Sequence, residues 1–435
     1  MKERKIFYGW LIVAIATLAL LISNGLSIGG FPVFYKSIRQ EFVQIGAVDS
    51  NQAESFIGFG ASLTFLTAGI ISPFAGWLIH KFSVKRMAVM GCVILGTALV
   101  LHSQTTSPTM VYVSRTLMGA SLGFVGVLAM TVLVANWFVR RRGTAIGILL
   151  TGTSFGGVLI PLFTAPLISL YGWRTAMLLV SLIIWLVLIP CLILLVKNYP
   201  SEIGLLPDGD TEISLETQMT QTASTGLTLF EAMRTPIFWI FSLCAALIFY
   251  PIFVTSQQFI LYLQTDKVGL SAEAGALAQS ALFFVSVFGK FLFGFLSDRI
   301  PPTRVMLLCC SIMFLGTLFL INLTSKTAFM FLIPFGMGYG GTFVLLQRLV
   351  ADYFGNKDYP KILGVITVVE TIGAATGGIL TGRLADAAGG DYTQAFSLVI
   401  AVTGTALLLV IILNFMDSKT VNRRNSNHHA ESEIR

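Results

Sequence analysis

Charged side chains are scarce in this sequence. Only 11% of its 435 residues are Asp, Glu, Lys or Arg, whereas 55% are hydrophobic. Soluble globular domains carry about 25% charged residues, so a water-facing surface cannot be built from so few. Most of the surface must therefore face lipid, which excludes a soluble globular fold.

Cysteines and nucleotide-binding patterns are also scarce or absent. The five cysteines lie inside apolar stretches and none shows metal-ligand spacing, so we interpret them as small buried residues. No G-x-x-x-x-G-K-[ST] loop is present, which argues against nucleotide-driven transport. No nucleophile accompanies a base in a plausible site. We therefore expect no metal, no cofactor and no enzymatic activity.

Long apolar stretches recur along the whole chain, each able to cross about 30 Å of hydrocarbon. They predict twelve transmembrane helices, at residues 8–30, 54–79, 86–104, 108–138, 143–170, 173–196, 236–264, 271–296, 303–323, 327–354, 360–386 and 392–415. The first stretch follows Lys2, Arg4 and Lys5, as in a signal peptide, but it has full spanning length and no small-residue cleavage site. We interpret it as the first helix.

Basic residues predict the orientation. With the N-terminus inside, the cytoplasmic connections hold clusters such as Arg140, Arg141 and Arg142, and the outer connections hold few basic residues. The positive-inside rule then places both termini in the cytoplasm of a multi-pass protein of the cell (inner or plasma) membrane. The net charge of +7 reflects this bias, so we expect no nucleic-acid partner.

A polar, acidic segment divides the chain into two halves. The predicted domains are an N-terminal six-helix bundle (1–197), a cytoplasmic linker (198–235), a C-terminal six-helix bundle (236–416) and a cytoplasmic tail (417–435). The halves repeat: Gly76-Trp-Leu-Ile-His-Lys matches Gly294-Phe-Leu-Ser-Asp-Arg, and Ala135-Asn-Trp-Phe matches Ala351-Asp-Tyr-Phe. Tandem halves of parallel topology place a substrate site between them, near the bilayer midplane.

Three motifs carry a family resemblance. They are Arg115-Thr-Leu-Met-Gly119-Ala-Ser-Leu-Gly123, Tyr171-Gly-Trp-Arg174 and Pro200-Ser-Glu-Ile-Gly-Leu-Leu-Pro-Asp-Gly209. On these residues the chain resembles the major facilitator superfamily, and within it the monocarboxylate transporter and oxalate:formate antiporter branch. The resemblance implies an all-α membrane protein with the major facilitator fold: twelve transmembrane helices in two pseudo-symmetric six-helix bundles around a central cavity.

The sequence departs from this family pattern at several charged positions. His80 stands where the family's first loop motif has Asp, whereas the second copy keeps Asp298 and Arg299. The resemblance implies that these three residues belong to a cytoplasmic lock between the halves, which His80 would make weaker or pH-dependent. Lys290 stands where the branch usually has Arg, and Glu370 where most relatives have a small or apolar residue.

Four charges fall inside the predicted spans: Arg115, Lys290, Arg348 and Glu370. A charge at the bilayer centre costs at least about 2.5–3.5 kcal/mol, so it is rarely kept without a function or a partner. Three cations against one anion favour an anionic substrate. Lys290 and Glu370 each lie about 12–14 Å from the cytoplasmic ends of their helices at 1.5 Å per residue. We predict that they face each other near mid-membrane.

These two residues are the main candidates for the site. Lys290 is the predicted anchor of a substrate carboxylate. Glu370 is predicted to compensate Lys290 in the empty site and to take a proton when substrate binds, because burial disfavours an ionised carboxylate. The alternative is a permanent ion pair that only holds two helices together.

Other polar residues are weaker candidates for substrate binding. Arg115 either contacts substrate or bonds to neighbouring backbone, and Arg348 either lines the pathway or extends to the interface. Asn24 and Gln257 are candidates to bond a hydroxyl or keto group, although hydrogen bonding between helices is the more common use of such residues.

Together these features predict a secondary transporter of small organic anions, most simply a proton-coupled carrier of a monocarboxylate such as lactate or pyruvate, working by alternating access. An antiporter of small dicarboxylates and an efflux carrier of another organic anion are the alternatives within transport. A non-transporting metabolite sensor is the alternative of a different class. The expected partners are the substrate anion, the proton and the lipid bilayer, and no oligomer is required.

Overall fold

The computed structural model describes residues 7–138, 141–209, 226–297, 299–321, 323–355 and 357–433. Within these ranges, the side chains of residues 76, 77, 80, 142, 143, 326, 359, 360 and 417–433 lie outside the description. The described part is helical throughout, and its only extended pairing is an isolated bridge between Gly226 and Gly355. An all-α fold is therefore confirmed.

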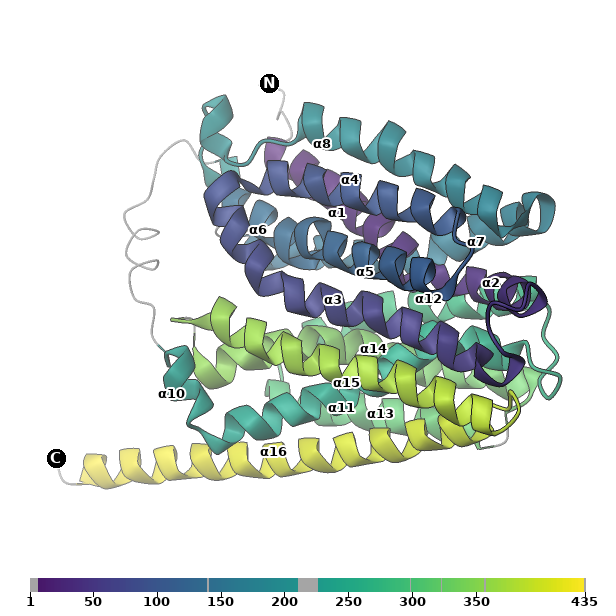
Figure 1. Ribbon diagram of the computed structural model, residues 1–435. Helices are drawn as coiled ribbons and strands as arrows, with labels where there is room; N and C mark the ends of the chain where they lie inside the picture. The colour runs from purple at the N-terminus through teal and green to yellow at the C-terminus, as the bar shows by residue number, and fades with distance from the viewer. Residues whose placement is uncertain are drawn as a thin grey trace, which may run out of the picture.

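The N-terminal half holds the elements that Figure 1 draws from purple to teal in its upper part. These are α1 (Tyr8–Asn24), α2 (Tyr35–Gln44), α3 (Ala53–Phe82), α4 (Val84–Ser103), α5 (Pro108–Val125), α6 (Val127–Trp137), α7 (Arg142–Ile183) and α8 (Ile189–Leu195). The C-terminal half lies below it in the same view. It consists of α10 (Leu229–Met233), α11 (Pro236–Leu263), α12 (Ala272–Ser297), α13 (Pro302–Thr317), α14 (Ser325–Phe354), α15 (Tyr359–Ala387) and α16 (Thr393–Glu433).

The described residues contain eleven apolar helical stretches long enough to cross a membrane, and one of them, Thr144–Leu195, is 52 residues long. At 1.5 Å per residue it would measure about 78 Å if straight, more than twice the hydrocarbon thickness. It breaks at Gly172, whose φ of 77° and ψ of 160° suit glycine and leave the helix. The stretch therefore crosses twice, and the prediction of twelve transmembrane helices is confirmed.

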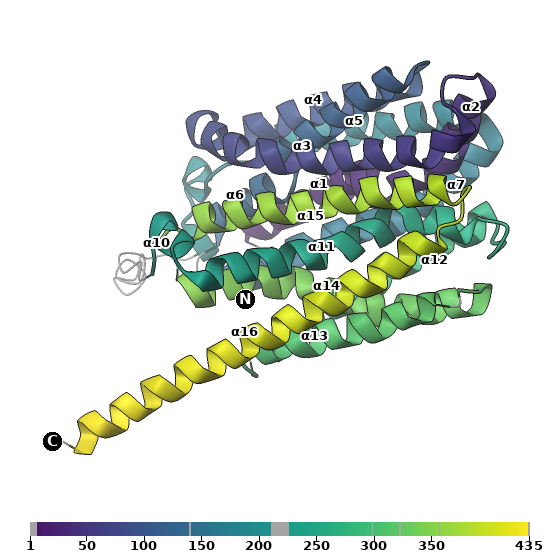
Figure 2. The ribbon, with the colours of Figure 1, turned by 60° about the horizontal axis from the view of Figure 1, so that its bottom comes forward.

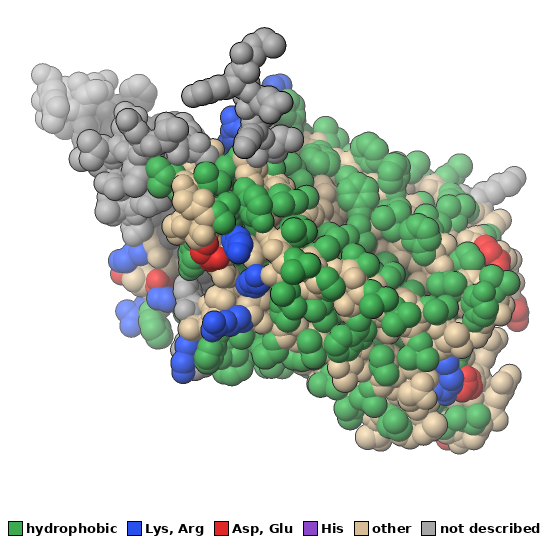
Figure 3. Space-filling view, turned by 90° about the horizontal axis from the view of Figure 1, so that it is seen from above, with side chains coloured by type: hydrophobic (Ala, Val, Ile, Leu, Met, Phe, Trp, Pro, Cys, Tyr) green, Lys and Arg blue, Asp and Glu red, His purple; other side chains and the backbone are tan. Residues whose placement is uncertain are grey.

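The surface of these helices is apolar where lipid would contact it. On α12, Phe284, Phe288, Phe291 and Phe295 are exposed, whereas Lys290 on the opposite face is buried. Figure 3 shows hydrophobic side chains across the middle of one face of the molecule and charged side chains toward its ends. This distribution is the one expected of a chain whose middle lies in hydrocarbon.

The two halves meet along two seams. One is formed by α3 and α15, which lie side by side in Figure 1 and Figure 2, and the other by α7 and α12. Small hydroxyl residues bond across both: Ser62 Oγ donates to Ala375 O (2.8 Å), and Ser280 Oγ donates to Val158 O (2.9 Å). These seams position the candidate site, because its residues lie along them.

The described ends of the linker are each held by one half. On the N-terminal side, Lys85 N donates to Asn198 Oδ1 (2.9 Å). On the C-terminal side, Leu229 N donates to Asp358 Oδ2 (3.0 Å), and Lys361 Nζ donates to Asp358 Oδ1 (2.9 Å). The hydrogen bond from Lys361, with that from Leu229, holds the pKa of Asp358 below its ordinary value. Each half therefore carries its own end of the linker.

We expect Gly340→Ala to destabilise the C-terminal half by about 1–3 kcal/mol, the usual cost of overpacking. A Cβ at Gly340 of α14 would lie 2.0 Å from Ser286 O of α12, so two helix backbones must separate. The measurement is thermal unfolding in detergent micelles. Gly364→Ala is the matched control, because a Cβ there meets nothing within 4 Å, and it should leave the melting temperature unchanged or slightly raised. Equal melting temperatures of the two variants would contradict the close contact between α12 and α14 at Gly340.

Candidate functional site

The Lys290 ammonium lies on the seam between α12 and α7. The residue is only 6% exposed, and its Nζ donates to Ser154 Oγ (2.7 Å), Thr153 Oγ1 (2.9 Å) and Leu150 O (3.4 Å). All three oxygens belong to α7, in the opposite half. Lys290 lies eight residues before position 298, or about 12 Å along its helix, so a cation of one half is bound by the other half at mid-membrane.

Every ligand of this ammonium is electrically neutral. Among the described residues, no carboxylate forms an ion pair or hydrogen bond with Lys290. The Phe343 ring lies on its C-terminal-half side, with its centroid 5.0 Å from Nζ, and Ser286 Oγ lies 3.0 Å from Ser154 Oγ. The site therefore combines a buried lysine, which has no carboxylate partner among the described residues, with three hydroxyl groups. The protons of these hydroxyl groups are already donated, from Thr153 to Leu150 O, from Ser286 to Phe283 O and from Ser154 to Ser286 Oγ, so the lysine is the main donor on offer to a carboxylate.

Glu370 lies on α15, one of the two helices that form the other seam. It is 8% exposed and forms no hydrogen bond or ion pair with any described residue. Its helix, α15, packs against α3 and α11, whereas α12 packs against α7 and α14. The expected compensation of Lys290 by Glu370 is therefore not made by direct contact, because the two helices belong to different seams.

Arg115 is bonded within the outer part of the N-terminal half. It is 2% exposed, with Nε donating to Gly60 O (3.2 Å), Nη1 to Ser27 O (3.4 Å) and Nη2 to Tyr35 Oη (3.2 Å). Its guanidinium carbon also lies 4.0 Å from the centroid of the Phe31 ring. These contacts favour backbone bonding, one of the two expected roles, over direct substrate binding.

Gln257 links the halves near Arg115. Its Oε1 accepts from Tyr35 Oη (2.8 Å), and its Nε2 donates to Ile28 O (2.9 Å). Both ends of the amide are thus used between helices, which favours the interhelical role over substrate binding. Asn24 differs, because its Nδ2 is buried without a hydrogen-bond partner among the described residues, and it remains available to a ligand or a water molecule.

The first span is broken by a π turn at Gly25–Gly29, a feature that is frequent at functional sites. Three successive carbonyls there accept hydrogen bonds from three other helices. Ser27 O accepts from Arg115, Ile28 O from Gln257, and Gly29 O from Gln279 Nε2 (3.4 Å). Sequence reasoning missed this turn and its partner Gln279, and it missed Tyr35, which bonds to Arg115 and Gln257. The glycines around the turn and Pro32 are signals of an interrupted helix.

The residues predicted near the cytoplasmic ends lie apart from this region. Arg348 Nη1 donates to Ser297 Oγ (3.0 Å), and its Nε lies 3.8 Å from Asp352 Oδ2, which favours an ion pair near the helix end. The Arg299 guanidinium lies 4.1 Å from the centroid of the Phe295 ring. Asp298 and the side chain of His80 lie outside the described residues, so the cytoplasmic lock remains a prediction.

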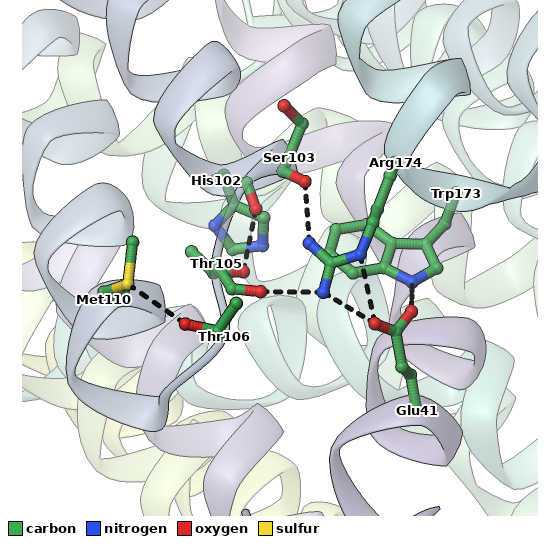
Figure 4. Close-up of polar contacts among 8 residues, drawn as sticks. All are labelled: Glu41, His102, Ser103, Thr105, Thr106, Met110, Trp173 and Arg174. Atoms are coloured by element: carbon green, nitrogen blue, oxygen red, sulfur yellow. Dashed lines mark hydrogen bonds and ion pairs between the residues drawn. The ribbon is translucent and has the colours of Figure 1, made fainter. Parts of the chain in front are cut away.

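A polar cluster at the connection between α4 and α5 joins several elements of the N-terminal half (Figure 4). Arg174 pairs with Glu41 (2.6 Å) and donates to the carbonyls of Ser103 and Thr105 (2.7 Å each), while Trp173 Nε1 donates to Glu41 Oε2 (2.6 Å). These bonds join α2, the connection after α4 and the break at Gly172. The cluster satisfies its own charges, so we interpret it as structural.

Comparison with known proteins places the chain in context. The sequence model of the Major Facilitator Superfamily matches residues 13–266 and 258–433. The MFS transporter asaE of Aspergillus flavus is 24% identical over 409 residues, covering 92% of this chain and 86% of that protein. Monocarboxylate transporter 2 of Mus musculus is 24% identical over 435 residues (94% and 85%), and monocarboxylate transporter 12 of Xenopus laevis is 25% identical over 381 residues (83% and 80%).

We expect Tyr35→Phe to lower the free energy of unfolding by about 1–3 kcal/mol, because it leaves buried polar atoms of Arg115 and Gln257 without a partner. The measurement is thermal unfolding in detergent micelles. Tyr8→Phe is the control, since Tyr8 Oη donates to Leu195 O at an exposed site, where water can replace the bond. Unfolding of Tyr35→Phe at the wild-type temperature would show that the bonds to Arg115 and Gln257 contribute little.

Proposed function

Because this chain belongs to the Major Facilitator Superfamily, we propose that it is a secondary transporter that carries a small monocarboxylate, such as lactate or pyruvate, together with a proton. The observation that carries the proposal is the Lys290 ammonium, which is buried on the seam between the halves and, among the described residues, is bound only by neutral oxygens. A buried cation with no counterion has a strong preference for an anionic ligand.

The surroundings of Lys290 support an anion with a single carboxylate. A carboxylate that replaces one neutral oxygen would gain a charge-assisted bond to the ammonium, which is about twice as strong as a neutral one. Thr153 and Ser154 of α7 would supply further donors once their hydroxyl protons turn away from Leu150 O and Ser286 Oγ, which accept them in this state. The Phe343 ring beside the ammonium offers an apolar surface to a short carbon chain, and it offers no donor to a second carboxylate. Relatives named monocarboxylate transporters are consistent with this substrate class.

The way the seam is built supports the proposal of alternating access. Lys290 belongs to one half and its three oxygen ligands to the other, so rocking of the halves would break these bonds. Substrate bound to Lys290 would replace them and would keep the charge satisfied while the seam opens. The fixed site between two moving halves is then the ammonium together with the hydroxyl groups that face it.

Glu370 is the proposed proton carrier. It is buried and has no partner among the described residues, so an ionised carboxylate there would be costly and the protonated form is favoured while the site is closed. Opening of the α3–α15 seam to water would allow the proton to leave. Movement of one proton with one monocarboxylate would be electroneutral.

The first test is substrate counterflow in proteoliposomes, with radiolabelled lactate, pyruvate, acetate and oxalate. We expect Lys290→Gln to reduce counterflow by about 10- to 100-fold, the equivalent of losing one charged hydrogen bond. Lys267→Gln is the control, because Lys267 is exposed and, among the described residues, bonds only to Thr393 Oγ1 (2.6 Å). Full activity of Lys290→Gln would reject the anion site. Exchange of oxalate alone would favour the dicarboxylate antiporter.

The second test separates exchange from proton coupling. We expect Glu370→Gln to retain counterflow, because the amide mimics the protonated acid, and to lose accumulation driven by an inward proton gradient. Both are measured at two pH values in the same proteoliposomes. Glu231→Gln is the control, since Glu231 caps the exposed α10. Accumulation by Glu370→Gln at the wild-type level would assign the proton to another group.

A further inference from the structure

The N-terminus of α3 has an unusual acceptor. The first N–H groups of a helix have no partner within it and are commonly satisfied by the side chain of the preceding residue. Gln52, at that position before α3, makes no such bond. Instead, Glu54 N donates to Asp386 Oδ1 (2.9 Å) and Ser55 N donates to Asp386 Oδ2 (2.8 Å). Asp386 lies at the end of α15, so a side chain of one half caps a helix of the other.

A second bond crosses the halves at the same place. Tyr392, which precedes α16 and is fully buried, donates from its Oη to Glu54 Oε2 (2.5 Å). The other oxygen of the Glu54 carboxylate pairs with Arg39 of α2. Each half thus contributes one carboxylate, and each carboxylate is bound by a group from the opposite half.

We propose that Asp386 and the Glu54–Tyr392 pair form an outer latch that holds the outer ends of α3 and α15 together and favours the state closed on that side. The bonds are charge-assisted, and Asp386 also faces the positive end of the α3 dipole. They can exist only while the two helix ends are in contact. Rocking of the halves toward outward opening would separate Asp386 from its two donors and Tyr392 from Glu54.

The neighbouring aspartate provides the comparison. Asp391 Oδ1 accepts from Thr393 N (2.9 Å) and Thr393 Oγ1 (2.6 Å), so it caps a helix of its own half. Removal of Asp391 removes a helix cap from the same connection without breaking any bond between the halves. Asp386 and Asp391 therefore share chemistry and surroundings, and they differ in whether the bond crosses the seam.

The experiment follows the opening of the seam by thiol labelling. Ser62 is buried, and its Oγ donates across the seam to Ala375 O, so a cysteine at position 62 reacts when α3 and α15 part. The full-length chain carries Ser62→Cys together with Cys191→Ser, in detergent or nanodiscs without substrate. We expect Asp386→Ala to raise the rate of maleimide labelling about 5- to 100-fold. Asp391→Ala should leave it within about twofold of the parent.

Asp386→Asn is a milder variant that should give an intermediate labelling rate and is less disruptive to the fold than Asp386→Ala. Its amide oxygen still accepts a hydrogen bond but carries no charge, so labelling should fall between the parent and Asp386→Ala. Cys309 and Cys310 are buried, so the maleimide labels them only if the C-terminal half unfolds. If they are labelled in Asp386→Ala, that variant is misfolded, and the labelling rate of Asp386→Asn tests the latch instead. Labelling at the parent rate in the folded Asp386 variants overturns the latch. The inference rests on the movement of the halves in the proposed function and not on the proposed substrate. Loss of transport in Lys290→Gln would therefore leave the labelling rates of the Asp386 variants unchanged.

Discussion

The structure depends on one constraint: hydrocarbon offers no hydrogen bonds, so a charged group inside the span is costly unless the protein satisfies it. Arg115 and Lys290 meet this constraint in different ways. Arg115 is held by the carbonyls of Gly60 and Ser27 and by Tyr35, all in its own half. In the described part of the chain, Lys290 is held by oxygens of the opposite half alone.

This difference assigns the two cations to different tasks. In the proposed cycle, the ligands of Arg115 would move with it when the halves rock, so the guanidinium would stay bonded and would hold the end of α1 in place. The ligands of Lys290 would leave it when the seam opens. A lysine that loses its ligands in every cycle would need a replacement, which the proposed anionic substrate would provide.

The sequence predicted the spans, because each depends only on a local run of apolar residues. It also predicted that Lys290 and Glu370 are buried, because depth along a helix follows from counting residues. It did not predict their partners, which depend on α12 packing against α7 and α15 against α3, far apart in the chain. Asp386 gave no signal at all, since an aspartate at a helix end carries no cost that would distinguish it.

The bonds that cross the seams differ in how much water can reach their polar groups when the halves separate. At the end of the bundle that carries the proposed latch, water can solvate Asp386 and the N–H groups of α3, so these strong charged bonds can break without a ligand. At mid-membrane, far less water is at hand for Lys290, and separation from α7 would leave an ammonium unsatisfied. In the proposed cycle the outer latch sets how readily the halves part, and the ammonium makes that parting depend on a bound anion. The coupling of binding to movement then follows from placing neutral hydroxyl ligands, and no counterion, opposite a buried lysine.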